Sequence, residues 1–294
     1  MLELQLWKMI HDPAFHYFWI QDKNPLGGTE KRRKIGAPNI GMHLLHTWLV
    51  KCLRDLSVDL GAATGSLPGC QPALNVKKHA GQRYFYLIDL SSAYDNVDGS
   101  KLGQILCQLE PSLDSEEVLI FLKRYCLTKA GGLIVGAPAS PDLFNIYAAV
   151  LIDGLLRPLC EKYGLVYTRY LDDLTFSSQE VIGTRKRKAI RQIVIASGLP
   201  IQHRKCQVAD LWQGPVFITG VGLDEDGRLF LPRHYLRKIR GMLHRAMYAG
   251  DVSRELVEGT MGAFKAVTKD RPLNCTEQRL VDLYKLYRRF IAVG

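Results

Sequence analysis

The stretch VYTRYLDDLTF at 166–176 sets two adjacent acids between two runs of residues that favour β-strands. Strands disfavour aspartate, and neighbouring carboxylates repel each other. A further acid, Asp89, lies in the apolar run YFYLIDL at 84–90, where a carboxylate is costly unless it is paired, hydrogen-bonded or metal-bound. Antiparallel pairing of these β elements would bring Asp89 next to Asp172, with Asp173 beside them. The sequence therefore predicts three carboxylates at one point of a sheet.

Three converging carboxylates need a cation to balance their charge. Mg²⁺ suits such a site, because it binds few protein carboxylates and completes its shell with water and phosphate oxygens. Two such ions can hold the attacking and leaving oxygens of an in-line phosphoryl displacement. An Asp-Asp pair in a turn is more often a solvated loop, and a lone strand aspartate is more often a hydrogen-bonded group. The combination of both patterns favours the metal-binding interpretation.

Composition adds an electrostatic argument. A net charge of +10 over 294 residues indicates a polyanionic partner, most often nucleic acid, although solubility alone is the plainer explanation. Seven scattered cysteines without C-x-x-C spacing indicate reduced thiols in a cytoplasmic protein. The first residues lack a signal-peptide pattern and no apolar run is long enough to cross a bilayer, so we expect no membrane contact.

The order of the expected elements predicts an α+β fold with helices on one face of an antiparallel sheet. The polar, basic residues 22–39 are expected to form a strand–turn element, and 61–72 a loop. We expect helices at 42–56, 99–109, 115–127, 141–161, 182–197 and from 232 onward, and strands at 84–90, 165–177, 206–211, 215–223 and 228–231.

Residues 232–248 show two stripes on one predicted helix. Leu236, Ile239, Leu243 and Met247 form an apolar stripe, and Arg233, Arg237, Arg240 and His244 form a basic one. The apolar stripe would pack inward, and the basic stripe would follow a nucleic-acid backbone without reading its sequence. A solvated basic face is the alternative.

Several segments together resemble one polymerase family. YLDD at 170–173 resembles the Tyr-x-Asp-Asp box of reverse transcriptases, and YLIDLSSAYDNVD at 86–98 resembles the strand with their first metal-binding aspartate. GAPASPDLFN at 136–145 resembles the Gly-x-x-x-Ser-Pro-x-Leu-x-Asn segment beneath template and nucleotide. The chain thus resembles reverse transcriptases of the bacterial retron or group II intron kind.

Three more segments follow in the same order. EKRRKIGAPN at 30–39 resembles the fingers motif of the family, HRKC at 203–206 a later motif with a functional lysine, and FITG at 217–220 the start of the primer grip. The resemblance covers about residues 30–225. It implies a right-hand polymerase with fingers over 1–83, a palm over 84–225 that returns to the fingers near 115–135, and a helical thumb over 226–294.

The resemblance also implies roles for individual residues. Asp89, Asp172, Asp173 and the Leu90 backbone carbonyl would bind two Mg²⁺ ions, and Lys205 would protonate the leaving pyrophosphate. The nucleotide site would comprise Lys31, Arg33, Tyr94, Val135 and Gly136. Primer and template would contact Ser140, Asn145, Tyr170, Thr219, Gly220, Arg233, Arg237 and Arg240.

Two positions bear on the choice of substrate. Tyr94 stands where the family places an aromatic gate against the ribose 2′-hydroxyl, which implies dNTP use; a core tyrosine is the alternative. Ile134 and Val135 stand where the family usually has Pro-Gln, and that glutamine contacts the incoming nucleotide. We therefore expect low copying fidelity.

Two short segments favour the retron branch. NVKKH at 75–79 resembles the retron Asn-Ala-x-x-His signature, and ITG at 218–220 resembles its Val-Thr-Gly. Asn75 and His79 are thereby candidate contacts to a structured RNA, although a buried loop histidine is the commoner situation. The length leaves no room for a maturase or His-Asn-His nuclease domain, as expected of a free-standing enzyme.

The resemblance predicts an RNA-directed DNA polymerase that copies a dedicated structured non-coding RNA from dNTPs into an RNA–DNA product. The setting would be anti-phage defence, with an effector protein from the same locus. One alternative is another defence-associated or intron-like branch with protein or untemplated priming. Others are a catalytically lapsed RNA-binding scaffold and, more distantly, a palm-type nucleotidyl cyclase, for which no nucleotide-loop signature is present.

Overall fold

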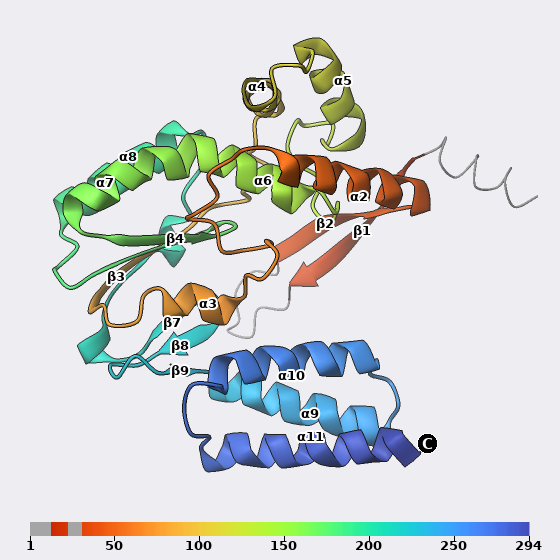
Figure 1. Cartoon of the computed structure of the whole chain (residues 1–294), viewed down its shortest axis with the longest axis vertical. Helices are drawn as coiled ribbons and strands as arrows, with labels where there is room; N and C mark the ends of the chain where they lie inside the picture. Colours follow the sequence, from red (N-terminus) through yellow and green to blue (C-terminus); the bar gives the residue numbers. More distant parts are fainter. Residues whose placement is uncertain (1–12, 23–30, 294) are drawn as a thin grey trace, which may run out of the picture.

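A four-stranded antiparallel sheet forms the centre of the molecule (Figure 1). The structure is a computed structural model that describes residues 13–22 and 31–293. The strand order in the central sheet is β4-β5-β3-β6. These strands are β3 (Tyr84–Asp89), β4 (Val166–Tyr170), β5 (Asp173–Ser178) and β6 (Gln207–Asp210). The mixed fold with an antiparallel sheet confirms the predicted class.

The β4–β5 hairpin sets where the acids lie. Tyr170 pairs with Asp173, so Leu171 and Asp172 form a two-residue turn. Leu171 has a φ of 54°, as such tight hairpins require of a turn residue. Asp89 lies opposite Asp173 in the β3–β5 register. The predicted proximity of Asp89 and Asp172 is also present, since the Leu90 amide donates to the Asp172 carbonyl at 3.0 Å, but Asp172 belongs to the turn and not to the strand.

The two faces of the central sheet are both covered. Tyr86 and Ile88 point into a core beneath the helices drawn above the sheet in Figure 1, whereas Phe85 belongs to a second core on the opposite face. The first core also contains Phe144 and Leu156. Its helices are α2 (Ile40–Asp55), α4 (Gly99–Leu109), α5 (Ser115–Tyr125), α6 (Ser140–Ala148), α7 (Gly154–Tyr163) and α8 (Thr184–Ala196).

One continuous helix, Ser140–Tyr163, runs through this core. It consists of α6, the π-helical turn η1 (Ala149–Asp153) and α7. By length and composition this helix could cross a membrane, although the sequence led us to expect no membrane-spanning segment. Most of its apolar window (61%) is buried inside the protein, so packing in the core accounts for its hydropathy.

A second, two-stranded sheet projects beside α2 (Figure 1). It pairs β1 (Phe15–Asp22) with β2 (Lys31–Pro38) in antiparallel register. The basic strand–turn element predicted over 22–39 contains β2, whereas β1 was not predicted. Asn39 links this sheet to α2, because its side-chain oxygen accepts a hydrogen bond from the Met42 amide at 2.9 Å.

The C-terminal part is a three-helix bundle joined to a small three-stranded sheet. Leu236, Ile239, Leu243 and Met247 are buried, as their spacing predicted. The bundle consists of α9 (Arg233–Tyr248), α10 (Arg254–Thr268) and α11 (Cys275–Val293). The sheet consists of β7 (Val216–Ile218), β8 (Val221–Leu223) and β9 (Leu229–Phe230), and short 3₁₀ turns cover His203–Lys205 and Leu211–Gln213.

The helix α3 (Pro72–Lys77) packs under the central sheet. The prediction that two residues of this region contact RNA is wrong. Asn75 and His79 were candidate RNA contacts, yet they are only 1% and 0% exposed. The His79 ring bonds through Nδ1 to Ser177 Oγ at 2.6 Å and through Nε2 to Thr168 Oγ1 at 2.7 Å. His79 therefore cross-links the sheet, and neither side chain is placed to touch RNA.

Burial makes His79 a source of pH-dependent stability. Desolvation lowers its pKa to about 4. Below pH about 6.5 His79 is protonated in the unfolded chain, whereas in the folded protein it stays neutral down to about pH 4. The contribution of neutral His79 to the unfolding free energy is therefore complete above pH about 6.5 and is lost as the pH falls towards about 4. The loss should reach about 3 kcal/mol. Urea unfolding of wild type and His79→Asn from pH 7.5 to 4 would measure it, and parallel curves would contradict it.

Candidate active site

The three aspartates meet at one end of the central sheet. Asp89 ends β3, Asp173 begins β5 and Asp172 lies in the turn between β4 and β5. Asp89 and Asp173 line a groove of about 300 Å³. We call it the acid groove; its other lining residues are Leu87, Ile88, Leu174, Thr175, Arg204, Lys205, Gln207, Phe217 and Thr219.

Burial and mutual repulsion disfavour the charged forms of these acids. The pKa of Asp173 rises to about 6, through burial first and then through the charges of Asp172 and Asp89. Burial likewise raises the pKa of Asp172, and Asp89 adds to this effect. A site that raises the pKa of two neighbouring carboxylates is a site where a bound cation is favourable.

Lys205 supplies a cation to this cluster. Its Nζ donates to Asp89 Oδ2 at 2.9 Å, while the lysine side chain stays 60% exposed and thus able to reach a ligand. In the described part of the chain, no three His, Cys, Asp or Glu side chains are arranged to hold a metal ion. The predicted convergence is thus incomplete: the acids share one site without forming a closed ligand set.

One arginine of the β1–β2 sheet acts on the acids. Arg33 lies near enough for its charge to oppose the rise in the Asp172 pKa. Ile20 pairs with Arg33 in the register and Phe18 with Ile35, so all four share one face. The strand that carries Phe18 and Ile20 was not predicted, although the aromatic run FHYFWIQ is typical of a strand. Lys31 begins β2, but its side chain lies outside the described residues.

Tyr94 lies beside Asp172. Burial raises the pKa of the Tyr94 hydroxyl, and the charge of Asp172 is the next cause. The ring packs edge-on against Phe144, with 5.3 Å between ring centroids. The structure thus places a fixed ring next to an acid, and the role of Tyr94 as a steric gate stays a prediction.

The loop with Val135 and Gly136 is attached to the β1–β2 sheet. The Val135 carbonyl accepts a hydrogen bond from the Gly36 amide at 2.8 Å. Gly136 has a φ of +97°, and a Cβ there would lie 2.7 Å from Ile35 Cγ2. Only glycine fits this junction, so the partly exposed Val135 is held at a defined place between sheet and palm.

Two predicted primer or template contacts are structural instead. Ser140 is buried, and its Oγ donates to the Ile134 carbonyl at 2.7 Å. Asn145 is buried too, and its Nδ2 donates to the Gly65 carbonyl at 3.0 Å. Direct side-chain contact with nucleic acid is excluded at both positions in this conformation. Tyr170 is only partly buried; its ring packs over Gly65.

Thr219 and Gly220 form the tight turn between β7 and β8. Both have positive φ, 48° and 81°, as two-residue hairpins require. Thr219 lines the acid groove. The turn is therefore placed to contact a strand that enters the groove.

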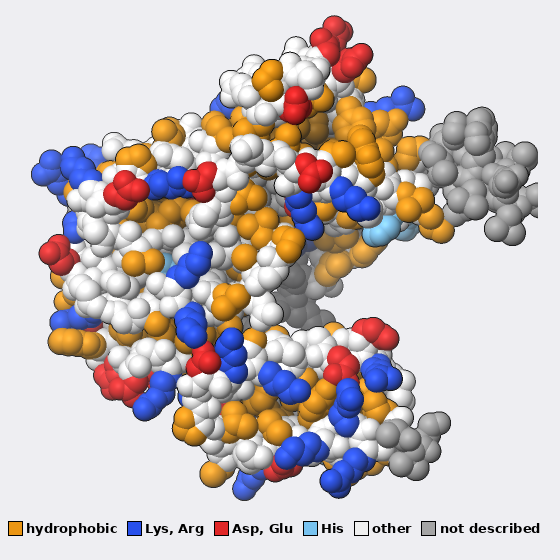
Figure 2. Space-filling view, viewed as in Figure 1, with side chains coloured by type: hydrophobic (Ala, Val, Ile, Leu, Met, Phe, Trp, Pro, Cys, Tyr) orange, Lys and Arg blue, Asp and Glu red, His pale blue; other side chains and the backbone are white. Residues whose placement is uncertain are grey.

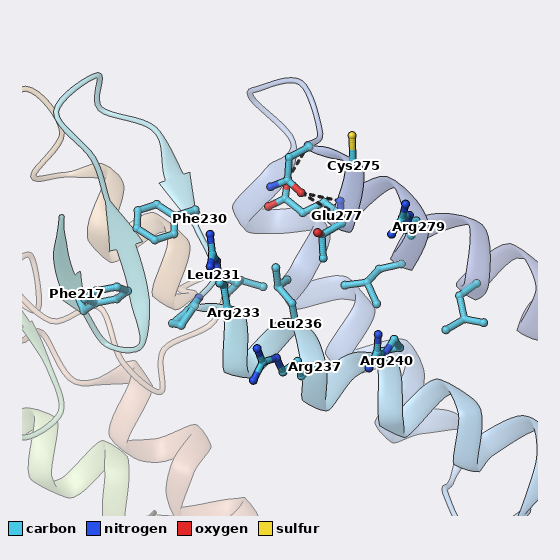
Figure 3. A pocket seen from close by; sticks show the side chains of 15 residues that line it. Phe217, Phe230, Leu231, Arg233, Leu236, Arg237, Arg240, Cys275, Glu277 and Arg279 are labelled. Atoms are coloured by element: carbon cyan, nitrogen blue, oxygen red, sulfur yellow. Dashed lines mark hydrogen bonds between the residues drawn. The ribbon is translucent and has the colours of Figure 1, made fainter. Parts of the chain in front are cut away.

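A larger basic groove lies next to the acid groove; Figure 3 shows the residues that line it. Phe217 lines both. This thumb groove, of about 980 Å³, is lined by Phe217, Phe230, Leu231, Pro232, Arg233, Leu236, Arg237, Arg240, Asn274, Cys275, Thr276, Glu277, Arg279, Leu280 and Leu283. Figure 2 shows the molecule hollowed between the bundle and the β1–β2 side.

The thumb groove attracts anions. In Figure 3 Arg233, Arg237 and Arg240 follow α9, and Arg279 lies on α11. Glu277, also in the lining, is buried and held by Arg271 at 2.8 and 2.5 Å, so its charge is compensated. Arg279 was not predicted as a binding residue, because tertiary packing decides which face of α11 lines the groove.

Comparison with known proteins identifies the family. The sequence family described as reverse transcriptase (RNA-dependent DNA polymerase) matches residues 20–223. The chain belongs to this family. It is 28% identical to the retron Mx65 reverse transcriptase of Myxococcus xanthus, covering 92% of this chain and 66% of that one. It is 26% identical to the retron Ec86 reverse transcriptase of Escherichia coli, covering 88% and 79%. The chain thus spans slightly less than two thirds of the first relative.

Solved structures confirm the polymerase fold. Apo telomerase from Candida tropicalis superposes with a TM-score of 0.53 at 10% identity, over 95% of this chain and 57% of that one. Candida albicans telomerase, solved with a fragment of telomeric RNA, has a TM-score of 0.51 at 10% identity, over 97% and 61%. At such identities the likeness concerns the fold alone.

Removing one carboxylate from this reverse transcriptase should stabilise it. Because the pKa of Asp173 is raised to about 6, its ionised form destabilises the folded state above that pH, and the cost disappears below about pH 4. Asp173→Asn should therefore raise the unfolding free energy by about 2 kcal/mol at pH 7.5 in EDTA, and not at pH 4.

Asp210→Asn is a matched control with the opposite sign. Arg83 lowers the pKa of this carboxyl on the same sheet, so its loss should destabilise. Chemical denaturation of the three proteins would decide. A destabilised Asp173→Asn protein at pH 7.5 would contradict the expected repulsion.

The thumb arginines should control the salt dependence of duplex binding. Each phosphate contact contributes about one to the slope of log affinity against log salt, so Arg237→Gln/Arg240→Gln should lower the slope by about two. Lys238→Gln is the control, since Lys238 shares α9 but does not line the thumb groove. Fluorescence anisotropy with an RNA–DNA duplex would measure both, and equal slopes would exclude the thumb groove as the binding track.

Proposed function

We propose that the chain is an active RNA-directed DNA polymerase of the retron type, which copies a dedicated structured non-coding RNA into DNA. One observation carries the proposal: Phe217 lines both the acid groove and the arginine-lined thumb groove, so the two grooves are neighbours. A strand held by the thumb arginines would have its end beside the aspartates. The similarity to retron reverse transcriptases supports the choice of branch.

The donor set fits divalent cations. Asp89, Asp172 and Asp173, with the Leu90 backbone carbonyl, would hold two Mg²⁺ ions, because hard oxygen ligands suit this ion and two of the acids have raised pKa values. When bound, the ions would supply stabilisation of the charge on the transferred phosphate. Lys205 would then release Asp89, with which it pairs in the present conformation.

The remaining residues would bind and orient the reactants. Lys31 and Arg33 would hold the triphosphate, and the Tyr94 ring would exclude a ribose 2′-hydroxyl. A primer 3′-hydroxyl, or an RNA 2′-hydroxyl or protein hydroxyl, would attack the α-phosphate of the dNTP. Lys205 Nζ would donate its proton to the leaving pyrophosphate.

The biological setting belongs to the same proposal. A structured RNA would serve as template and primer, the net charge of +10 favours such a partner, and the RNA–DNA product would remain in the cytoplasm. Phage defence with an effector protein from the same locus would be the purpose. Val135 in place of the usual glutamine would lower copying fidelity. Because this position departs from the family pattern, the second candidate is a defence-associated reverse transcriptase with another mode of priming.

Purification from the native locus tests the activity. Wild type and the Asp172→Asn/Asp173→Asn variant would be isolated, and their bound nucleic acid treated separately with RNase and DNase. DNase-sensitive material in the wild type alone is expected, since both carboxylates contribute to catalysis. One abundant structured RNA with DNA joined to a 2′-oxygen would support the retron branch, whereas DNA without a matching RNA would favour the second candidate. RNA alone, identical in both samples, would indicate a binding scaffold and overturn the proposal.

A further inference from the structure

A buried charged network lies directly behind the Leu171–Asp172 turn, which we call the acid turn. Arg169 and Asp153 are 0% and 1% exposed. Arg169 donates through Nε to Asp153 Oδ1 at 2.9 Å and through Nη2 to Oδ2 at 2.7 Å. Tyr167 adds a hydrogen bond from its hydroxyl to Asp153 Oδ1 at 2.7 Å. A fully buried bidentate pair has a fixed geometry, so its third donor also points in a fixed direction.

That third donor reaches the turn between the strands. Arg169 Nη1 donates to the Leu171 carbonyl at 3.3 Å and to Asn145 Oδ1 at 2.9 Å. Leu171, at a φ of 54°, is the residue before Asp172 and holds a conformation that leucine rarely adopts. One guanidinium therefore connects the core helix to the backbone that carries the catalytic acids.

The surroundings keep this guanidinium in place. Asn145 also donates to the Gly65 carbonyl at 3.0 Å, and a Cβ on Gly65 would lie 3.0 Å from the Leu171 amide nitrogen. Asp153 ends the π-helical turn of the core helix, and such turns often occur at functional sites. The turn is thus enclosed from behind by groups that have little freedom to move.

Fold stability alone is a weak explanation for this network. Apolar residues of similar volume often replace a buried ion pair without loss of stability, because desolvation offsets the attraction between the charges. What apolar residues cannot provide is a directed hydrogen bond to the Leu171 carbonyl. Lysine cannot provide all the bonds either, since it lacks the planar fork of arginine.

We propose that Arg169, held by Asp153 and Asn145, is a positioning residue that fixes the Leu171–Asp172 turn for nucleotide transfer. The proposal rests on the proposed polymerase function. It assigns Asn145, in the segment that resembles the template-contacting motif, to support of the acid turn from behind.

The decisive variant is Asp153→Leu/Arg169→Met, which replaces the ion pair with an apolar pair. It should fold, with a melting temperature moderately below that of wild type, because the Tyr167 hydroxyl and the Asn145 side-chain oxygen lose their partners. Its single-turnover rate of dNTP incorporation should fall about 100-fold, while the KM for dNTP changes less than about threefold, because misplacement of reacting groups affects the chemical step. Primer extension on an RNA template would measure both constants.

Metal-directed cleavage gives a readout independent of activity. Fe²⁺ bound in place of Mg²⁺, with ascorbate and peroxide, cuts the backbone near the ion. Wild type should be cut around Asp172 and the apolar-pair variant much less, because its turn no longer holds the acids together. Equal cleavage in both proteins, with equal rates, would overturn the proposal.

Two further variants separate positioning from stability. Arg169→Lys keeps a positive charge beside Asp153, so it should fold, yet it should be slow because the bonds to Asn145 and Leu171 are lost. Arg54→Met is the matched control: it removes the 2.9 Å bond from Arg54 to the buried Asp142 between α2 and α6, which is not part of the Arg169 network, and should retain activity.

The outcomes distinguish the two levels of inference. Inactive wild type would refute the proposed function. Active wild type together with a fully active apolar-pair or Arg169→Lys variant would refute the positioning role alone. If the apolar-pair variant does not fold, Arg169→Lys decides: slow chemistry in a folded protein supports the proposal, and normal chemistry overturns it.

Discussion

Repulsion between partly buried carboxylates is the constraint on which this structure depends. Burial disfavours ionisation of Asp172 and Asp173, and each charge disfavours the others. Neighbouring acids persist at this position only if the backbone holds them there. The two-residue turn of the β4–β5 hairpin and its pairing with β3 provide that support, and Lys205 offsets part of the charge.

The central strand β3 connects this site to the rest of the molecule. Its residues alternate between two cores: Tyr86 and Ile88 face the helices of the palm, and Phe85 faces the core shared with α3 and the thumb bundle. Asp89 at its end thus has a fixed position relative to both bodies. The acid groove and the thumb groove are neighbours, because Phe217 lines both.

Much of this architecture could be predicted from local pattern. The apolar run 84–90, the β-prone runs around Asp172 and the stripes of α9 each showed the period of the element that they form. The strand β1 was missed because its aromatic residues do not alternate with polar ones. The exact partner of Asp89 in the register, Asp173, could not be predicted, since a turn residue and the first strand residue cannot be distinguished from sequence.

The site was harder to predict than the fold. Asn75, His79, Ser140 and Asn145 belong to segments that resemble family motifs, yet all four are buried. A motif shows that a residue type is needed but not whether it faces a ligand or the core. Arg169 illustrates the converse: in sequence it is one polar residue in a strand, and its contacts come from segments 16 and 24 residues away in the chain.

The most direct test of the central claim is a magnesium titration of thermal stability. If a divalent cation relieves the repulsion among the acids, Mg²⁺ should raise the melting temperature of the wild type by about 5–10 °C near saturation. It should leave the Asp172→Asn/Asp173→Asn variant unchanged. Equal shifts in both proteins, or none in the wild type, would contradict the claim that these carboxylates form a cation site.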